Sequence, residues 1–260
     1  MRELFARRLP LFLVATFVAP YLMYATNTGQ FRWMAFVQLA ALATALSLWY
    51  KILPASPLAD GAFLVLTAAV VLRGYLDPIY SSPMHGLHLE ILGYLALRRL
   101  CIMVMLVERR VEGIGFGFIP NLAEWKIGAL HFVYFLVVAV PLAWLTHLVK
   151  LGPGMSLWKN AGIFIGALWV VALPEEFFFR GLLQQWLGQW TRSPGLGLAG
   201  ASILFGAAHL GFRGFPNWRF ALVAAIAGWF YGRAYRQAGS IRASMVTHAL
   251  VVTLWRAWFV

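Results

Sequence analysis

Residues 162–181 read GIFIGALWVVALPEEFFFRG, an apolar run followed at once by two adjacent glutamates. The chain has nine acidic residues among 260, so a pair of them at the end of an apolar run stands out. An ionised carboxylate at bilayer depth costs roughly 3 kcal/mol or more, and such groups therefore face a protein interior or a water-filled cavity. The stretch predicts a membrane helix that carries its polar groups inward.

The composition extends this prediction to the whole chain. Apolar residues make up 62% of the sequence and charged residues 12%, and the mean hydropathy is +0.75. Runs of about 20 apolar residues cross a bilayer as helices, because backbone groups in hydrocarbon must satisfy one another. We expect an all-α, polytopic transmembrane helix bundle, with candidate spans near 10–26, 33–53, 59–76, 86–107, 127–149, 158–174, 176–190, 195–211, 219–236 and 243–259.

The net charge of +12 raises the question of a nucleic-acid partner. The 21 basic residues are scattered between apolar runs and form no long basic block, which is typical of loop residues that contact anionic lipid headgroups. We therefore expect the lipid bilayer as a partner and no nucleic acid. Arg2, Arg7 and Arg8 favour a cytoplasmic N-terminus.

A change of character divides the chain. Residues 107–128 read VERRVEGIGFGFIPNLAEWKIG, and their mixed charges, glycines and proline are typical of an interfacial connection. Few ionisable residues lie inside the apolar runs before this segment, and several lie inside those after it. We expect an N-terminal transmembrane region of uncertain role at 1–125 and a catalytic transmembrane core at 126–260.

The ionisable residues of the second region have a chemical pattern. Glu176 and Arg180 are four residues apart, the spacing of an ion pair on one helix face. Pro174 is typical of a first helical turn, so Glu175 is predicted at a helix start. His209 ends an apolar stretch in SILFGAAHLGF, where small residues allow another helix to approach closely. His248 lies inside a second such stretch, ASMVTHALVV.

A carboxylate with two imidazoles supports two routes to hydrolysis. Glu175, His209 and His248 could hold Zn²⁺ or another divalent metal with an open position for water, or activate water directly without a metal. The sequence contains no HExxH motif and no GxSxG motif, so it gives no support to a metalloprotease of that type or to a serine hydrolase.

Other interpretations compete with catalysis. The glutamates could make only structural ion pairs, the histidines could be packed and hydrogen-bonded, and buried ionisable residues also mark ion pathways in transporters. A separate group, His85, His88 and Glu90, could hold a metal, although a polar helix start near the membrane surface explains it more simply.

The motifs of this region resemble those of the CAAX-protease and bacteriocin-processing family of intramembrane metalloproteases, which includes the type II CAAX prenyl endopeptidases. Glu175, Glu176 and Arg180 match its EExxxR motif in the context EEFFFRG, and Phe205 with His209 matches FxxxH. The third motif, HxxxN or HxxxD, is matched at the histidine, in ASMVTHALVV, but not four residues later. The resemblance covers about 155–255, and the N-terminal 100 residues show none.

The resemblance implies a bundle of about eight or more transmembrane helices around an internal polar cavity. It implies that Glu175 and His209 activate water, that Glu176 and Arg180 support the site, and that His248 stabilises the oxyanion. Val252 stands where the family has an amide or acid that shares this last task. Thr247 or Asn217 could supply the missing donor. Loss of one such donor costs roughly 100- to 1000-fold in turnover.

Two functions are therefore predicted as alternatives. The first is an intramembrane endopeptidase, in a multi-pass protein of a bacterial inner (plasma) membrane, that cleaves a membrane-embedded or lipidated peptide or protein substrate. The second is a catalytically impaired relative that acts as a membrane peptide-binding, immunity or scaffold protein, and Val252 is its motivation.

Overall fold

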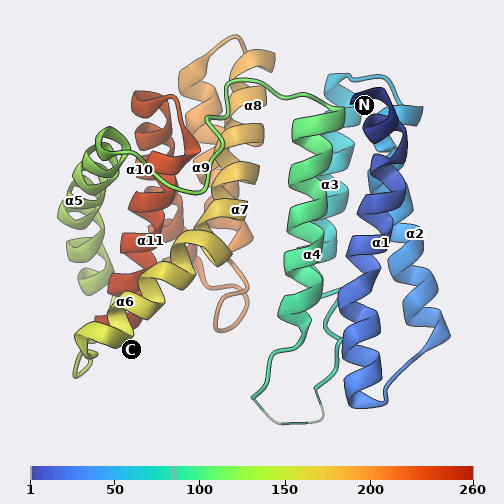
Figure 1. The fold of residues 1–260 in the computed structure, drawn as a ribbon. Coiled ribbons are helices and arrows are strands. Elements are labelled where there is room, and N and C mark those ends of the chain that lie inside the picture. The colour runs from blue at the N-terminus through green and yellow to red at the C-terminus, as the bar shows by residue number, and fades with distance from the viewer. Residues whose placement is uncertain (1, 83, 85, 260) are drawn as a thin grey trace. The chain divides into compact units, whose positions relative to one another are not determined.

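The computed structural model describes residues 2–82, 84 and 86–259, and within these ranges the chain is built from helices (Figure 1). The predicted all-α fold is confirmed. The chain divides into two compact units, residues 1–111 and 112–260. Among the described residues, an isolated antiparallel β-bridge joins Leu151 to Phe259.

The first unit consists of four α-helices and a short π-helical segment. Helix α1 packs against α2 and α4. The buried carboxylate of Asp60 accepts two hydrogen bonds of 2.8 Å from Arg109 and one of 2.8 Å from the hydroxyl of Tyr50. The negative charge of Asp60 is thus paired with the positive charge of Arg109. The elements are α1 (Arg2–Thr28), α2 (Trp33–Ile52), α3 (Pro57–Leu72), α4 (Glu90–Met103) and η1 (Val104–Glu108).

The second unit is a bundle in which α10 packs against α9, α5 and α11 (Figure 1). Its π-helical segments all lie within one stretch of chain that also holds the acidic pair. The elements are α5 (Leu122–Leu145), α6 (Leu157–Gly166), η2 (Ala167–Ala172), α7 (Leu173–Glu176), η3 (Phe177–Gln184), α8 (Gln185–Trp190), α9 (Pro194–Ala208), α10 (Trp218–Ala238) and α11 (Ile241–Trp258).

Local signals in the sequence explain where these helices begin. Asn121 and Glu124 form a reciprocal capping box at the start of α5, which satisfies two backbone N–H groups that the helix leaves free. The side chain of Ser240 caps α11, and Gly239 adopts the left-handed conformation between α10 and α11, where a residue without Cβ is favoured.

The acidic pair does not begin a helix, contrary to the prediction from Pro174. Residues Leu157–Trp190 form one apolar helical run of 34 residues, and Glu175 lies in its interior. Proline cannot donate to the preceding turn, but wide π-helical turns on both sides of α7 accommodate it without ending the helix. The predicted spans 158–174 and 176–190 are therefore one element.

Four helices among the described residues are long and apolar enough to cross a membrane. Helices α3 and α9 are also apolar but shorter. These findings fit an integral membrane protein. The four candidate spans are Arg8–Thr28, Trp33–Ile52, Leu122–Leu145 and Leu157–Trp190.

The contacts divide the chain at 111/112, nearer the N-terminus than the predicted 125/126. The reason is the segment that precedes α5, which is hydrogen-bonded into the second unit. The carbonyl of Gly113 accepts from the hydroxyl of Tyr235 at 2.9 Å, and the carbonyl of Gly115 accepts from Ser240 at 2.9 Å. A Cβ atom on Gly115 would lie 2.4 Å from the Ser240 backbone, so the close approach requires glycine there.

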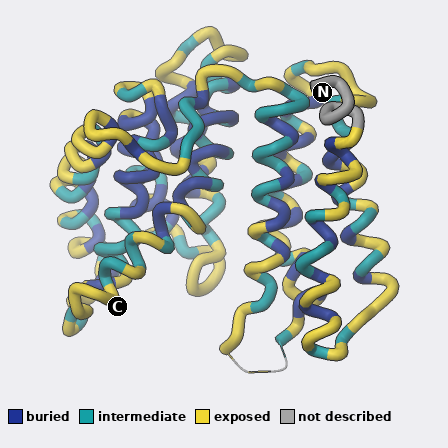
Figure 2. The backbone as a smooth tube through the Cα atoms, viewed as in Figure 1, coloured by how far each residue is buried: buried dark blue, intermediate teal, exposed yellow. Residues whose placement is uncertain are grey.

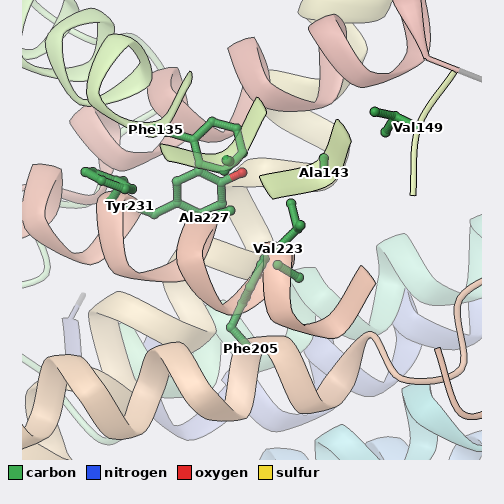
Figure 3. Packing of buried hydrophobic residues seen from close by; sticks show 10 residues of the cluster. Phe135, Ala143, Val149, Phe205, Val223, Ala227 and Tyr231 are labelled. Atoms are coloured by element: carbon green, nitrogen blue, oxygen red, sulfur yellow. The ribbon is translucent and has the colours of Figure 1, made fainter. Parts of the chain in front are cut away.

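The core of the second unit joins α5, α9 and α10 (Figure 2; Figure 3). This cluster contains both small and aromatic side chains, and helices approach closely where glycines face them. A Cβ atom on Gly206 would lie 2.5 Å from the carbonyl of Ala221 on α10, which supports the predicted close approach at this residue. The cluster comprises Phe135, Ala139, Ala143, Val149, Phe205, Val223, Ala224, Ala227, Phe230 and Tyr231.

Candidate functional site

A fully buried ion pair lies at the centre of the second unit. Arg180 Nη1 lies 3.2 Å from Glu176 Oε1, and both side chains are 0% exposed. The predicted i,i+4 pair is therefore present. Arg180 also donates from Nη2 to the carbonyl of Gly228 on α10 at 2.8 Å. The lack of a side chain at Gly228 matters, because a Cβ there would lie 3.2 Å from that same Nη2.

Aromatic rings enclose the guanidinium. Its central carbon lies 4.7 Å from the centroid of Phe205 and 5.2 Å from that of Tyr231. Desolvated cation–π contacts of this kind stabilise a charge by about 2 kcal/mol. The ring of Tyr231 also stacks on His248, with centroids 4.6 Å apart and planes at 16°. Tyr231 thus contacts both the cation and the imidazole.

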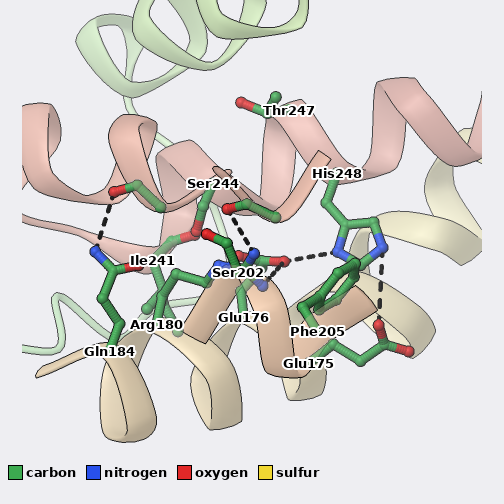
Figure 4. A network of polar contacts seen from close by, with 12 residues as sticks. Glu175, Glu176, Arg180, Gln184, Ser202, Phe205, Ile241, Ser244, Thr247 and His248 are labelled. Carbon is green, nitrogen blue, oxygen red and sulfur yellow. Dashed lines mark hydrogen bonds and ion pairs between the residues drawn. The ribbon is translucent and has the colours of Figure 1, made fainter. Parts of the chain in front are cut away.

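His248 joins the two glutamates (Figure 4). Its Nδ1 lies 2.7 Å from Glu176 Oε1, and its Nε2 lies 3.9 Å from Glu175 Oε2. Glu176 is an acceptor beside Arg180, so Nδ1 carries the proton and donates it to the carboxylate. This leaves Nε2 directed toward Glu175, whose side chain is 27% exposed whereas that of Glu176 is 0% exposed.

His209 lies at the end of α9 and is fixed by its own helix. Its Nδ1 lies 2.7 Å from the carbonyl oxygen of Phe205. Because a carbonyl only accepts, Nδ1 must donate, and in the neutral ring Nε2 is then the free acceptor. The imidazole also packs on the ring of Phe205, at 4.6 Å between centroids. The residues of the FxxxH motif therefore contact each other directly.

One cavity of about 210 Å³ brings these groups together. Glu175, His209 and His248 line it, while Glu176 and Arg180 do not. Its walls are mostly apolar and come from α5, α10 and α11. An apolar cavity with a few convergent polar groups is the usual form of a ligand or active site. The site thus has one partly exposed carboxylate and two imidazoles at a cavity wall, supported from behind by a buried ion pair.

Comparison with known proteins agrees with this arrangement. Residues 157–254 match the family model described as type II CAAX prenyl endopeptidase Rce1-like. We refer to this matching stretch, residues 157–254, as the Rce1-like domain. It begins at α6 and ends within α11, so it contains the acidic pair and both histidines.

A curated relative and the solved structures add little detail. A stretch of 82 residues is 29% identical to the uncharacterised protein YpbD of Bacillus subtilis strain 168. The alignment covers 32% of this chain and 38% of YpbD, so the chain matches less than half of that protein's length. No solved structure matches the chain. The family resemblance predicted from the motifs is confirmed for the Rce1-like domain.

Neither substitute donor predicted for the Rce1-like domain faces its cavity. Val252 lines the cavity one turn after His248. The hydroxyl of Thr247 donates to the carbonyl of Gly128 on α5 at 2.9 Å, and Figure 4 shows it directed away from the glutamates. Asn217 caps α10 and donates to Phe212. The place of the usual amide or acid is therefore apolar.

The geometry does not assemble a metal centre in the Rce1-like domain. Glu175 and His248 approach each other, but among the described residues no three His, Cys, Asp or Glu side chains are grouped to hold an ion. His209 is held through Nδ1 on its own helix. The predicted metal set of Glu175, His209 and His248 thus shares a cavity, but in the described part of the chain these side chains are not grouped as three ligands.

Two site residues were not predicted from the sequence. Tyr231 and Gly228 lie in a part of α10 that matches none of the motifs, so only the packing of α10 reveals their roles.

The competing group near residue 85 is only partly described. His85 lies outside the described residues. Glu90 begins α4, and its carboxylate lies 2.8 Å from Nδ1 of the exposed His88, as a polar helix start predicts.

Proposed function

We propose that this chain is a multi-pass intramembrane endopeptidase that hydrolyses a peptide bond of a membrane-associated or lipidated substrate. The observation that carries the proposal is the convergence of Glu175, His209 and His248 on one apolar cavity inside the Rce1-like domain. Glu175 lies in α7, His209 at the end of α9 and His248 in α11, so the fold and not the local sequence brings them together.

The geometry supports distinct roles for the two glutamates. Glu175 is partly exposed in the cavity, where it can take a proton from water. Glu176 is fully buried between Arg180 and His248, where it orients the imidazole. A base held by a third group is the usual arrangement for activating a nucleophile.

In the proposed reaction the oxygen of water attacks the scissile carbonyl carbon as Glu175 removes its proton. In its protonated form, His248 donates from Nδ1 to Glu176 and from Nε2 to the oxyanion that forms. The carbon–nitrogen bond then breaks, and the proton held by Glu175 passes to the leaving amine. The neutral tautomer of His209 places its Nε2 as a second acceptor at the same cavity.

In the buried network of Glu176, Arg180 and His248, two polar atoms lack a hydrogen-bond partner among the described residues. Glu176 Oε2 and Arg180 Nε are buried without a hydrogen-bond partner among the described residues. Such groups cost about 1–3 kcal/mol each, and a buried ion pair is often no more stable than an apolar replacement. Orientation of His248 explains why these charges are retained.

The proposed site of action is the inner (plasma) membrane of a bacterium. The four long apolar helices and the similarity to a protein of Bacillus subtilis support this proposal.

Cleavage of quenched fluorogenic peptides, with and without a prenyl group, by detergent-purified protein tests the proposal. We expect His209→Gln to lower turnover strongly. His131→Gln is the control, because His131 also belongs to an apolar stretch of helix but bonds to Gln237 and does not line the cavity. Equal turnover of the two variants, with both folded, would contradict the proposal.

Val252 supports a second candidate, a membrane protein that binds a peptide without cleaving it, as an immunity or scaffold protein does. The apolar side chain removes a donor that the family resemblance predicts, and neither Thr247 nor Asn217 replaces it. Tight peptide binding by folded native protein that cleaves no member of the library would favour this candidate.

A further inference from the structure

A separate cavity, of about 570 Å³, lies within the first unit and is lined by charged groups of both signs. Its walls come from the end of α3, from the turn that follows it and from the first part of α4. The polar lining positions on α4 recur every four residues, which places them on one face of that helix. The polar side chains that line this cavity are Arg73, Asp77, Glu90, Tyr94 and Arg98.

The carboxylate of Asp77 is held at this cavity by contacts to two elements. Its Oδ1 accepts a hydrogen bond of 2.7 Å from the hydroxyl of Tyr94 on α4. Its Oδ2 lies against Gly74, where an added Cβ atom would approach it to 2.5 Å. Gly74 also has a φ of +62°, a conformation that favours glycine. The fold therefore sets the position of Asp77, although this residue is exposed.

The charges of the cavity are not neutralised by pairing with one another. Arg73 is exposed, and in the described part of the chain no ion pair involves it, although Asp77 lines the same cavity. The carboxylate of Glu90 lies 2.8 Å from Nδ1 of the exposed His88, which does not line the cavity. A ligand that carries both a positive and a negative group can therefore find a partner for each.

Exposed apolar side chains adjoin the charged groups. Leu72 and Ile91 line the cavity and are 61% and 47% exposed, and Leu95, one turn beyond Ile91 on α4, is 38% exposed. Exposed apolar groups beside a charged cavity are typical of a membrane contact, where lipid headgroups meet acyl chains. These side chains favour a ligand that has an apolar part as well as a charged one.

We propose that this cavity binds a phospholipid whose headgroup carries both a phosphate and a primary ammonium group, as phosphatidylethanolamine does. Arg73 and Arg98 bind the phosphate, because guanidinium groups donate parallel hydrogen bonds to phosphate oxygens. Asp77 and Glu90 accept hydrogen bonds from the ammonium group. Two positive and two negative side chains match a headgroup without net charge. The site is independent of the proposed hydrolysis.

The same groups distinguish this headgroup from those of other phospholipids. The choline group has no N–H to donate and is usually bound by a cage of aromatic rings, whereas Tyr94 is the only aromatic side chain among the described residues that line the cavity. Phosphatidylglycerol has no ammonium group and leaves both carboxylates without a positive partner. We therefore expect phosphatidylethanolamine to bind more tightly than either of these lipids.

Charged residues near helix ends have a simpler use, because they contact lipid headgroups without selecting among them. Arg110 and Glu112 provide the comparison. Both are exposed, and neither lines the cavity. Arg110→Gln and Glu112→Gln thus remove the same charges as changes inside the cavity, and a difference between the two sets separates a binding site from general headgroup contact.

The test is a titration of detergent-purified protein with phosphatidylethanolamine, phosphatidylcholine and phosphatidylglycerol of identical acyl chains, followed by native mass spectrometry. Native protein should bind phosphatidylethanolamine about tenfold more tightly than the other two, as expected for one added charge-assisted contact. Asp77→Asn keeps an acceptor for Tyr94 and should lower the affinity for phosphatidylethanolamine alone, about tenfold. Arg73→Gln should lower the affinity for all three lipids, because all carry the phosphate.

The control variants Arg110→Gln and Glu112→Gln should bind the three lipids like native protein. Equal affinity of native protein for the three lipids, or an equal loss in the control variants, overturns the site. The unfolding temperature shows that each variant is folded, and phosphatidylethanolamine should raise it more in native protein than in Asp77→Asn.

A soluble headgroup distinguishes a membrane lipid from a free metabolite of the same chemistry. Free phosphoethanolamine carries the phosphate and the ammonium group but no acyl chain, so it should bind much more weakly than the lipid and compete poorly with it. Binding of free phosphoethanolamine as tight as that of the lipid overturns the lipid as the ligand. All of these measurements record binding or unfolding, so their outcome does not depend on whether the protein cleaves peptides.

Discussion

His248 Nδ1 lies 2.7 Å from Glu176 Oε1, although the two residues are 72 positions apart in the sequence. This contact fixes which nitrogen of His248 faces the cavity, and the same carboxylate oxygen is held by Arg180 at 3.2 Å. The orientation of the cavity imidazole is therefore coupled to a buried ion pair that does not line the cavity.

Replacement of Glu176 by glutamine should destabilise the protein strongly. The change keeps the shape of the side chain but leaves Arg180 buried without a countercharge, which typically costs about 3–5 kcal/mol. Thermal unfolding in detergent measures the effect. Glu175→Gln is the control and should unfold near the native temperature, because Glu175 is partly exposed and its ion pair with His248 is as long as 3.9 Å. Similar unfolding temperatures for the two variants would contradict the proposed division of roles.

Tyr231 should act through its ring. Tyr231→Phe retains the stacking on His248 and the contact with Arg180, so we expect turnover within about threefold of native. Tyr231→Ala removes a buried ring, at a cost of about 3–5 kcal/mol, and lets the imidazole move, which can lower turnover by about 100-fold. Turnover and unfolding temperature are compared for the three proteins. A severe loss of turnover in folded Tyr231→Phe would instead indicate a role for the hydroxyl.

Val252→Asn should raise turnover. It restores a donor at the cavity wall, and such donors contribute roughly 100- to 1000-fold in related chemistry, so an increase of at least tenfold is expected. Val252→Leu is the control for a change of side chain without a donor. If Val252→Asn cleaves no faster than native protein while binding peptide equally well, the apolar residue does not limit the reaction.

Chelators should not abolish cleavage. The expectation follows from the arrangement of Glu175, His209 and His248, which share the cavity without forming a three-ligand group. Turnover is measured before and after treatment with 1,10-phenanthroline and after addition of Zn²⁺. Loss of turnover on chelation, with recovery on adding Zn²⁺, would show that these side chains rearrange around an ion.

Local patterns were enough to predict the helical fold and the pairing of Glu176 with Arg180, because both depend on spacing within one helix. They were misleading at Pro174, where the sequence suggests a helix start but π-helical turns continue the helix. The predicted division at 125/126 did not include the hydrogen bonds from the hydroxyls of Tyr235 and Ser240 that tie the carbonyls of Gly113 and Gly115 to the second unit.

Long-range contacts could not be predicted from the sequence. Nothing near Tyr231 or Gly228 indicates that α10 places them against His248 and Arg180. The resemblance implies that Glu175 and His209 activate water together, and it says nothing of the approach of Glu175 to His248, which lies on α11. Packing also engages Thr247 and Asn217 in hydrogen bonds away from the cavity, so neither is placed to act as the substitute donor.

The most direct test of the central claim is single-turnover cleavage of a quenched peptide by native protein and Glu175→Gln, with unfolding temperature and peptide affinity measured on both. The account predicts that Glu175→Gln folds and binds peptide like native protein but cleaves at least about 100-fold more slowly, as expected for loss of a general base. Cleavage by Glu175→Gln at close to the native rate would contradict it.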